Sequence, residues 1–335
     1  MFLFYHEGIR YNTHMTNLWQ ELPKPFFVQA PLEQVSDVVF REILATIGKP
    51  DVMFTEFTNV DGLCSTGSEK VANRLRYNDT QHPIIAQIWG LTPDHYREAA
   101  IKIRELGFDG IDLNMGCPDR DVIKKGCCAA LIENHTLAAE IIQATKEGAK
   151  DLPVSVKTRI GIRKIVTEEW ISFLLEQDIA NLTIHGRTVS EMSKVPAHWD
   201  EIAKGVVIRN QMGVKTTIVG NGDILSREQG IEMHAEYNVD GIMIGRGMFQ
   251  NFWVFNKDQT HVTMDKVDKL QLLSQHITLW DKTWGDTKDF NVLKKFYKVY
   301  IHGFENASEL RMELMQLSTA TETLEYLNTQ IKQLI

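Results

Sequence analysis

The sequence predicts a (β/α)8 barrel, the TIM-barrel class of α/β fold, followed by a C-terminal all-helical domain. Two observations predict the barrel: eight short β-branched runs occur along the chain, and amphipathic helical stretches separate them. Runs that are apolar throughout suit parallel strands covered by helices, and eight β–α units favour a closed barrel over an open sheet. The third observation, the lack of any strand candidate after residue 262, predicts the helical domain.

The eight expected strands are Phe26–Ala30, Val52–Glu56, Ile84–Ile88, Gly110–Asn114, Val154–Arg159, Leu182–His185, Thr217–Gly220 and Gly241–Ile244. The helices expected between them carry apolar residues at three- and four-residue spacing, which places those residues on one helical face. Examples are Pro93–Leu106, Leu137–Glu147, Glu168–Glu176 and Arg227–Tyr237.

Three more helices are expected after the barrel, at Lys266–Trp284, Asn291–Phe304 and Ser308–Ile335. The chain is therefore expected to divide into an N-terminal extension over residues 1–24, a catalytic barrel over 25–261 and a helical domain over 262–335. The extension is polar and aromatic, and Met15 within it is an alternative start.

Composition narrows the classes of function. The 335 residues are 43% hydrophobic and 24% charged, which is typical of a globular protein and is more chain than the roughly 250 residues of a plain barrel. No apolar run is long enough to cross a bilayer, and the N-terminus lacks the pattern of a signal peptide. The four cysteines form no CxxC pair, which indicates a reducing compartment rather than a zinc site. We expect a cytoplasmic monomer with no bound metal and no membrane contact.

Polar residues cluster where six successive expected strands end, and in a barrel these ends form the active site. They are Gln87 after the third strand, Asn114 and Cys117 after the fourth, Lys157 and Arg159 on the fifth, His185 and Arg187 after the sixth, Asn221, Gly222 and Asp223 after the seventh, and Gly245 and Arg246 after the eighth.

Two glycine turns follow the last two strands, Gly-Asn-Gly-Asp-Ile over 220–224 and Gly-Arg-Gly over 245–247. Glycine lets backbone N–H groups approach an anion, and the start of a helix adds partial positive charge. Arg246 would add a forked donor. These turns predict a phosphate site; the alternative is a pair of tight strand–helix connections.

Lys157 lies inside the apolar strand Pro-Val-Ser-Val-Lys-Thr-Arg. A buried lysine is costly without a partner, and a cation beside a flavin would stabilise its anionic reduced form. The alternative is a structural ion pair with Glu56 or Asp112.

Cys117 lies on a Gly/Pro loop, Asn-Met-Gly-Cys-Pro. A thiol of ordinary pKa, about 8.5, is protonated at neutral pH and can donate a proton to carbon. The alternative is a buried small hydrophobe, which is how we interpret Cys127 and Cys128.

These motifs resemble those of the tRNA-dihydrouridine synthases. The similar segments are Ala-Pro-Leu-Glu-Gln-Val-Ser-Asp (30–37), Gln-Ile-Trp-Gly (87–90), Gly-Ile-Asp-Leu-Asn-Met-Gly-Cys-Pro (110–118), Val-Lys-Thr-Arg-Ile-Gly (156–161), Ile-His-Gly-Arg-Thr (184–188) and Gly-Asn-Gly-Asp-Ile (220–224). The resemblance covers residues 25 to 325, including Lys-Lys-Phe (294–296) and Glu-Leu-Arg (309–311) of the tail.

The resemblance implies a reaction in which NADPH reduces FMN and the flavin passes hydride to C6 of a uracil in tRNA. Cys117 matches the cysteine that protonates C5, and Asn114 matches the residue that holds the uracil. We expect Arg159 beside them to contact the substrate as well. The flavin-contacting positions of the family are matched by Pro31, Leu32, Glu33, Gln87, Lys157, His185, Asn221, Gly222, Asp223, Gly245 and Arg246.

The sequence departs from the family pattern at three places. Gln34 stands where the first loop usually has glycine, and residues 189–194 replace a stretch that often contains an aromatic residue. His198 replaces the usual aspartate before Trp199.

Two other functions fit the same residues. One is an FMN-barrel oxidoreductase acting on a free pyrimidine, such as a dihydroorotate or dihydropyrimidine dehydrogenase; the helical tail argues against it, since a small substrate needs no such appendage. The other is a tRNA-binding protein that has lost catalysis, and the intact Cys117, Lys157 and His185 argue against that.

Binding of tRNA to a chain of formal net charge −8 requires that basic residues be gathered on one surface. We expect Lys294, Lys295 and Lys298 in the tail to contact tRNA, with Arg311 nearby in sequence. Four more basic residues fall in loops at the catalytic rim: Lys124, Lys125, Arg163 and Lys164. The alternative is a set of solvated surface lysines.

Overall fold

The structure is a computed structural model that describes residues 17–257, 265–285 and 287–334. Most of the expected N-terminal extension, including Met15, and the expected domain boundary at residues 261 and 262 lie outside the described residues.

Parallel strands form the barrel in the order β1-β9-β8-β7-β6-β5-β4-β2. A parallel bridge between Val28 and Val52, with a hydrogen bond from Gln29 N to Val52 O of 3.0 Å, joins the two end strands and brings the ring to closure. The predicted barrel is therefore confirmed. The strands are β1 Phe26–Gln29, β2 Met53–Phe54, β3 Thr58–Asn59, β4 Ile84–Trp89, β5 Gly110–Met115, β6 Val154–Arg159, β7 Asn181–His185, β8 Thr217–Asn221 and β9 Gly241–Ile244.

The expected second strand, Val52–Glu56, is reduced to β2 and breaks off before β3, an additional strand outside the expected range; both pair with β4. Side-chain acceptors replace ladder bonds where it breaks: Phe54 N donates to Gln29 Oε1 at 3.0 Å, and Gln87 N donates to Thr55 Oγ1 at 3.1 Å. The break lies at the catalytic end of the barrel, where Phe57 lines the cavity described below.

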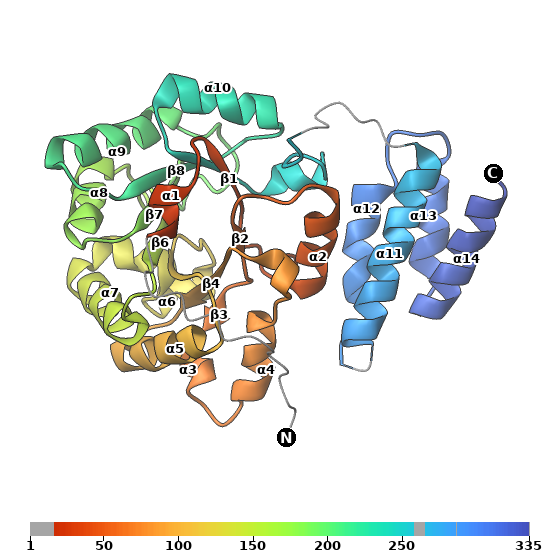
Figure 1. The fold of residues 1–335 in the computed structure, drawn as a ribbon, viewed down its shortest axis with the longest axis horizontal. Helices are drawn as coiled ribbons and strands as arrows, with labels where there is room; N and C mark the ends of the chain where they lie inside the picture. The colour runs from red at the N-terminus through yellow and green to blue at the C-terminus, as the bar shows by residue number, and fades with distance from the viewer. Residues whose placement is uncertain (1–16, 258–264, 286, 335) are drawn as a thin grey trace.

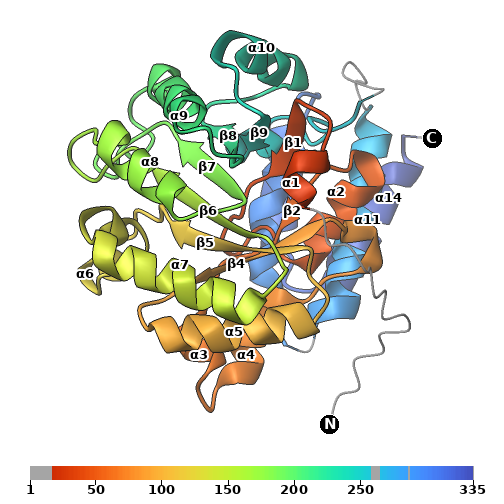
Figure 2. The ribbon, with the colours of Figure 1, turned by 60° about the vertical axis from the view of Figure 1, so that its left-hand side comes forward.

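Helices surround the barrel, as Figures 1 and 2 show. Several begin with a local signal: Asp37 caps the helix that starts at Val38 through Val39 N and Phe40 N, and Pro93 lies in the first turn of the helix that it begins. The long helices are α2 Val38–Ile47, α5 Pro93–Glu105, α7 His135–Ala149, α8 Thr167–Glu176, α9 Trp199–Met212 and α10 Arg227–Tyr237; the short ones are α1 Leu18–Glu21, α3 Val60–Leu63, α4 Ser68–Ala72 and α6 Arg120–Lys124. No helix in the described part of the chain is long and apolar enough to cross a membrane.

The tail is helical, as predicted, but two of its three expected helices are interrupted. It consists of α11 Lys266–Trp284, the 3-10 helix η5 Phe290–Phe296, α12 Tyr297–Tyr300, α13 Ala307–Gln316 and α14 Ala320–Lys332. The last break has a local cause, since Leu317 is extended and Thr319 with Glu322 forms a capping box that starts a new helix.

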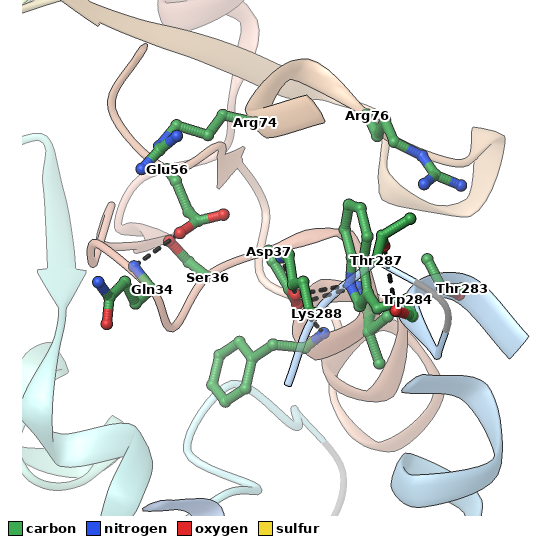
Figure 3. Close-up of polar contacts among 12 residues, drawn as sticks. Gln34, Ser36, Asp37, Glu56, Arg74, Arg76, Thr283, Trp284, Thr287 and Lys288 are labelled. Atoms are coloured by element: carbon green, nitrogen blue, oxygen red, sulfur yellow. Dashed lines mark hydrogen bonds and ion pairs between the residues drawn. The ribbon is translucent and has the colours of Figure 1, made fainter. Parts of the chain in front are cut away.

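The helical segment packs beside α2, on one side of the barrel (Figure 1). Trp284 at the end of α11 donates from Nε1 to Asp37 Oδ2 at 2.9 Å, and Lys288 Nζ lies 3.5 Å from the same oxygen (Figure 3). Asp37 caps α2 with its other oxygen. One carboxylate therefore joins the first barrel helix to the tail.

Candidate active site

A cavity of about 660 Å³ opens at the carboxyl ends of the strands. Its lining includes Cys117 and all thirteen barrel residues that the sequence predicted to contact cofactor or uracil. The predicted members are Pro31, Leu32, Glu33, Gln87, Asn114, Lys157, Arg159, His185, Asn221, Gly222, Asp223, Gly245 and Arg246. Parallel strands that end at one rim explain why residues so distant in sequence meet.

A series of side-chain hydrogen bonds runs from the barrel interior to the thiol loop. Buried Asp112 accepts from Gln87 Nε2 at 2.7 Å, and Gln87 Oε1 accepts from Asn114 Nδ2 at 3.1 Å. Asn114 Oδ1 in turn accepts from Gly116 N at 3.1 Å and Cys117 N at 3.0 Å. Each amide thus has one orientation that satisfies its partners.

The Cys117 thiol is more acidic than its sequence context indicated. A hydrogen bond from the Cys128 side chain lowers the pKa of Cys117 to about 7, against the effect of burial. The ordinary pKa expected for this thiol is therefore wrong, because Cys128, interpreted as a packing residue, is also its hydrogen-bond partner. Cys128 is buried, with φ 54°, in the 3-10 helix η3 Cys128–Glu133.

Lys157 projects from β6 into the cavity, with Nζ 3.1 Å from Asn221 Oδ1. Burial, with a smaller effect of nearby Arg159, lowers the pKa of Lys157 to about 8. Burial raises the pKa of neighbouring Asp112 to about 6. Lysine and aspartate therefore remain oppositely charged between those two values, but no direct ion pair joins them among the contacts of the described residues.

Arg187 fixes the tautomer of the His185 ring. Its side chain is 2% exposed, and its Nη1 lies 3.2 Å from His185 Nε2. Arginine can only donate, so Nε2 accepts and the ring proton lies on Nδ1. Burial and then the surrounding cations, Arg159 first, hold the pKa of His185 well below its ordinary value. The imidazole is therefore neutral.

Arg187 also supports the turn after β8. Its Nη2 pairs with the carboxylate of Asp223, which accepts from Ala197 N at 2.9 Å as well, and its Nε donates to Val195 O at 2.7 Å. Sequence reasoning placed Arg187 at the right strand end but gave it no role.

The backbone of that turn requires glycine at its centre. Gly222 has φ 142°, and a Cβ there would lie 2.5 Å from Ala197 Cβ. At Gly245 an added Cβ would make an ordinary van der Waals contact, at 3.5 Å from Ala30 Cβ. Lys157, Arg159 and Arg246 supply positive charge to the same cavity, and Glu33 Oε2 is buried without a hydrogen-bond partner among the described residues. These features fit a bound flavin phosphate with its ring system.

The three tail lysines have different surroundings. Lys294 Nζ donates to Met315 O at 2.9 Å, and Lys295 Nζ donates to Gln34 O in the loop after β1. Lys298 is exposed and forms no hydrogen bond or ion pair within the described part of the chain. The structure does not bring these lysines into the cavity.

Several cavity residues were not among the contacts predicted from the sequence, although some lie within the quoted motifs. They are Ala30, Phe57, Gly116, Pro118, Ile224, Leu225, Met243, Gly247 and Gln250. Most adjoin a predicted residue, so the position after each strand end was the available signal. No group of three or more His, Cys, Asp or Glu side chains in the described ranges is placed to hold a metal ion.

A parallel barrel whose strand ends join two glycine turns, a half-buried lysine and an acidic thiol has the make-up of a flavin-dependent oxidoreductase. The model of the family "Dihydrouridine synthase (Dus)" matches residues 28–335. The chain belongs to the dihydrouridine synthase family, a family of flavin-dependent oxidoreductases.

Relatives are similar over nearly the whole chain. A probable tRNA-dihydrouridine synthase of Staphylococcus aureus (strain Mu50 / ATCC 700699) is 46% identical over 91% of this chain and 93% of its own. Probable tRNA-dihydrouridine synthase 2 of Bacillus subtilis (strain 168) is 44% identical over 91% of this chain and 94% of its own. A solved structure of morphinone reductase in complex with tetrahydroNAD has 13% identity and a TM-score of 0.48, covering 69% of this chain and 86% of that chain.

Proposed function

We propose that this protein is a tRNA-dihydrouridine synthase that uses FMN and NADPH to saturate the C5–C6 bond of a uracil in tRNA. The observation that carries the reaction is the placement of an acidic thiol, Cys117, on the wall of a cavity that also holds Lys157 and the glycine turns. The near full-length similarity to tRNA-dihydrouridine synthases supports the substrate.

The residues that would hold FMN fall into two groups. Gly222, Asp223, Gly245 and Arg246 would hold the phosphate, with Asp223 contributing its backbone because its carboxylate already pairs with Arg187. The ring system would be contacted by Pro31, Leu32, Glu33, Gln87, Lys157, His185 and Asn221. When bound, the flavin supplies two-electron reduction chemistry, with NADPH as the source of electrons.

Cys117 acts as the general acid. A pKa of about 7 leaves the thiol part protonated at neutral pH and matches the operating pH, which favours proton transfer. Asn114 holds the loop by accepting from Gly116 N and Cys117 N, and its Nδ2 keeps a second hydrogen for the substrate. Arg159 donates from Nε to Gly116 O at 2.9 Å and so fixes the same loop from the substrate side.

The direct test uses the purified protein with transcribed tRNA. We expect a yellow protein with non-covalent FMN that forms dihydrouridine in tRNA with NADPH and leaves free uridine and dihydroorotate unchanged. The product is measured by mass spectrometry of digested tRNA. Turnover of a free pyrimidine without tRNA would favour the small-substrate alternative, and a colourless protein that cannot be reconstituted with FMN would contradict the proposal.

We further propose that basic residues at the rim and in the tail contact tRNA phosphates. Arg163 and Lys164 are exposed in the loop after β6 and form no ion pair among the described residues. In the tail, Lys298, Lys269 and Arg311 all act on His302 and lower its pKa, after the larger effect of burial. Three cations therefore lie close together on a protein of formal net charge −8.

We expect Lys298→Ala, and separately Arg163→Ala with Lys164→Ala, to weaken tRNA binding. For every phosphate that a variant no longer neutralises, the log–log dependence of affinity on salt should become shallower by about 0.7–0.9. Titrations at several salt concentrations measure this slope. Lys332→Ala at the end of α14 is the control, because this lysine is also exposed but lies at the far end of the tail. An unchanged slope in both variants would exclude these residues as docking contacts.

A further inference from the structure

One residue of the loop after β1 has a backbone conformation that its side chain disfavours. Pro31, Leu32 and Glu33 line the cavity, and the next residue, Gln34, has φ 58°. This left-handed region suits glycine, while a side chain with a Cβ is crowded there. The conformation of Gln34 must therefore be stabilised by contacts elsewhere in the structure.

Two charged side chains bind the two peptide groups of Gln34. Its N–H donates to Glu56 Oε1 at 2.6 Å, as Figure 3 shows, and its carbonyl accepts from Lys295 Nζ. Glu56 is 5% exposed and follows β2, whereas Lys295 comes from η5 in the helical segment. Hydrogen bonds to ionised groups are stronger than those between neutral ones. The barrel and the tail thus hold Gln34 from opposite ends.

The tail also contacts Asp37, three residues after Gln34. Asp37 accepts a hydrogen bond from Trp284 Nε1 (Figure 3). Two cations lie over the Trp284 ring: Lys288 Nζ is 3.6 Å and the Arg76 guanidinium carbon 4.6 Å from the ring centroid. The loop that lines one side of the cavity is therefore bounded at its far end by contacts with the helical segment.

We propose that Lys295 is a positioning residue for the cofactor: by holding Gln34 in the left-handed conformation, it keeps the loop of Pro31, Leu32 and Glu33 in place against the flavin. The helical segment is then part of the flavin site as well as a docking surface for tRNA. The proposal rests on the proposed binding of FMN. It predicts that the need for Lys295 depends on which residue stands at position 34.

The first test is the affinity of the apoprotein for FMN, measured by quenching of flavin fluorescence. Lys295→Met should raise the Kd about tenfold, which is the effect expected for loss of one hydrogen bond from a charged donor. Lys295→Arg should bind FMN nearly as the natural chain does. Lys282→Met is the matched control, because Lys282 is an exposed lysine of α11 with no contact to the loop, and its Kd should not change.

The second test separates positioning from general support of the fold. Glycine adopts positive φ without help, so in a Gln34→Gly background Lys295→Met should change the Kd less than about threefold. An equal loss in both backgrounds would overturn the proposal, as would a Kd of Lys295→Met within about twofold of the natural chain. If Lys295→Met alone does not fold, the Kd values for FMN of Gln34→Gly and of the Gln34→Gly, Lys295→Met double variant are compared instead. A difference of more than about threefold between them would overturn the proposal. Failure of the natural chain to bind FMN would instead contradict the proposed function.

Discussion

Replacing Cys117 by alanine is expected to abolish most dihydrouridine formation while leaving the bound flavin and the oxidation of NADPH intact. The thiol lies on the cavity wall and, as general acid, would contribute about 10²–10⁴-fold to the rate. Single-turnover formation of dihydrouridine in tRNA measures the loss. Cys64→Ala is the control, since Cys64 is outside the cavity and contacts His95 O. A wild-type rate in Cys117→Ala would show that another group donates the proton.

The dependence of the same rate on pH identifies the donor. A general acid acts in its protonated form, so the rate should fall as pH rises through the Cys117 pKa of about 7. Cys128→Ala removes the hydrogen bond that lowers this pKa, and the falling limb should then move to higher pH. Cys64→Ala should leave the limb where it is. A limb that does not move in Cys128→Ala would contradict the thiol–thiol contact as its cause.

Replacing Arg187 by methionine is expected to give a protein that folds but does not retain flavin. The variant leaves Val195 O and His185 Nε2 without their Arg187 donor and removes the ion pair of the Asp223 carboxylate with Arg187. We expect the Kd for FMN to rise at least about 100-fold, or about 2.7 kcal/mol. The free energy of unfolding should fall by about 2 kcal/mol, below the range for a fully buried pair because Asp223 is 36% exposed.

Arg209→Met is the matched control for that variant. Arg209 Nη1 pairs with Asp240 Oδ2 at 2.7 Å, before β9 begins and so at the opposite end of the barrel from the cavity. It should lower thermal stability without changing flavin affinity. If Arg187→Met and Arg209→Met lose flavin to the same extent, the effect of Arg187 comes from stability alone.

The barrel and its site were predictable because their signals are local or follow from the shared direction of the strands. Most strands are apolar or β-branched runs, and a residue at the carboxyl end of a strand, such as Asn221, lies at the catalytic rim in any parallel barrel. The sequence also contains a signal for the break within the expected helix Ser308–Ile335, since Thr319 and Glu322 have the spacing of a capping box.

Contacts between distant parts of the chain were not predictable in the same way. Lys295 and Gln34 are 261 residues apart, and neither residue type indicates the other. The 3-10 form of η5 fits its packing, because buried Phe290, Leu293 and Phe296 lie three residues apart and such positions are eclipsed in that helix type. The pKa of Cys117 likewise depends on Cys128, ten residues beyond the loop.

The series from Asp112 through Gln87 and Asn114 to the thiol loop has a consequence for how the substrate is received. A carboxylate accepts only, so it orients the first amide, and the first amide orients the second. The conformational entropy of this loop is therefore lost during folding and not when a uracil arrives. In the proposed reaction, Cys117 would therefore protonate the base without a prior rearrangement of its loop.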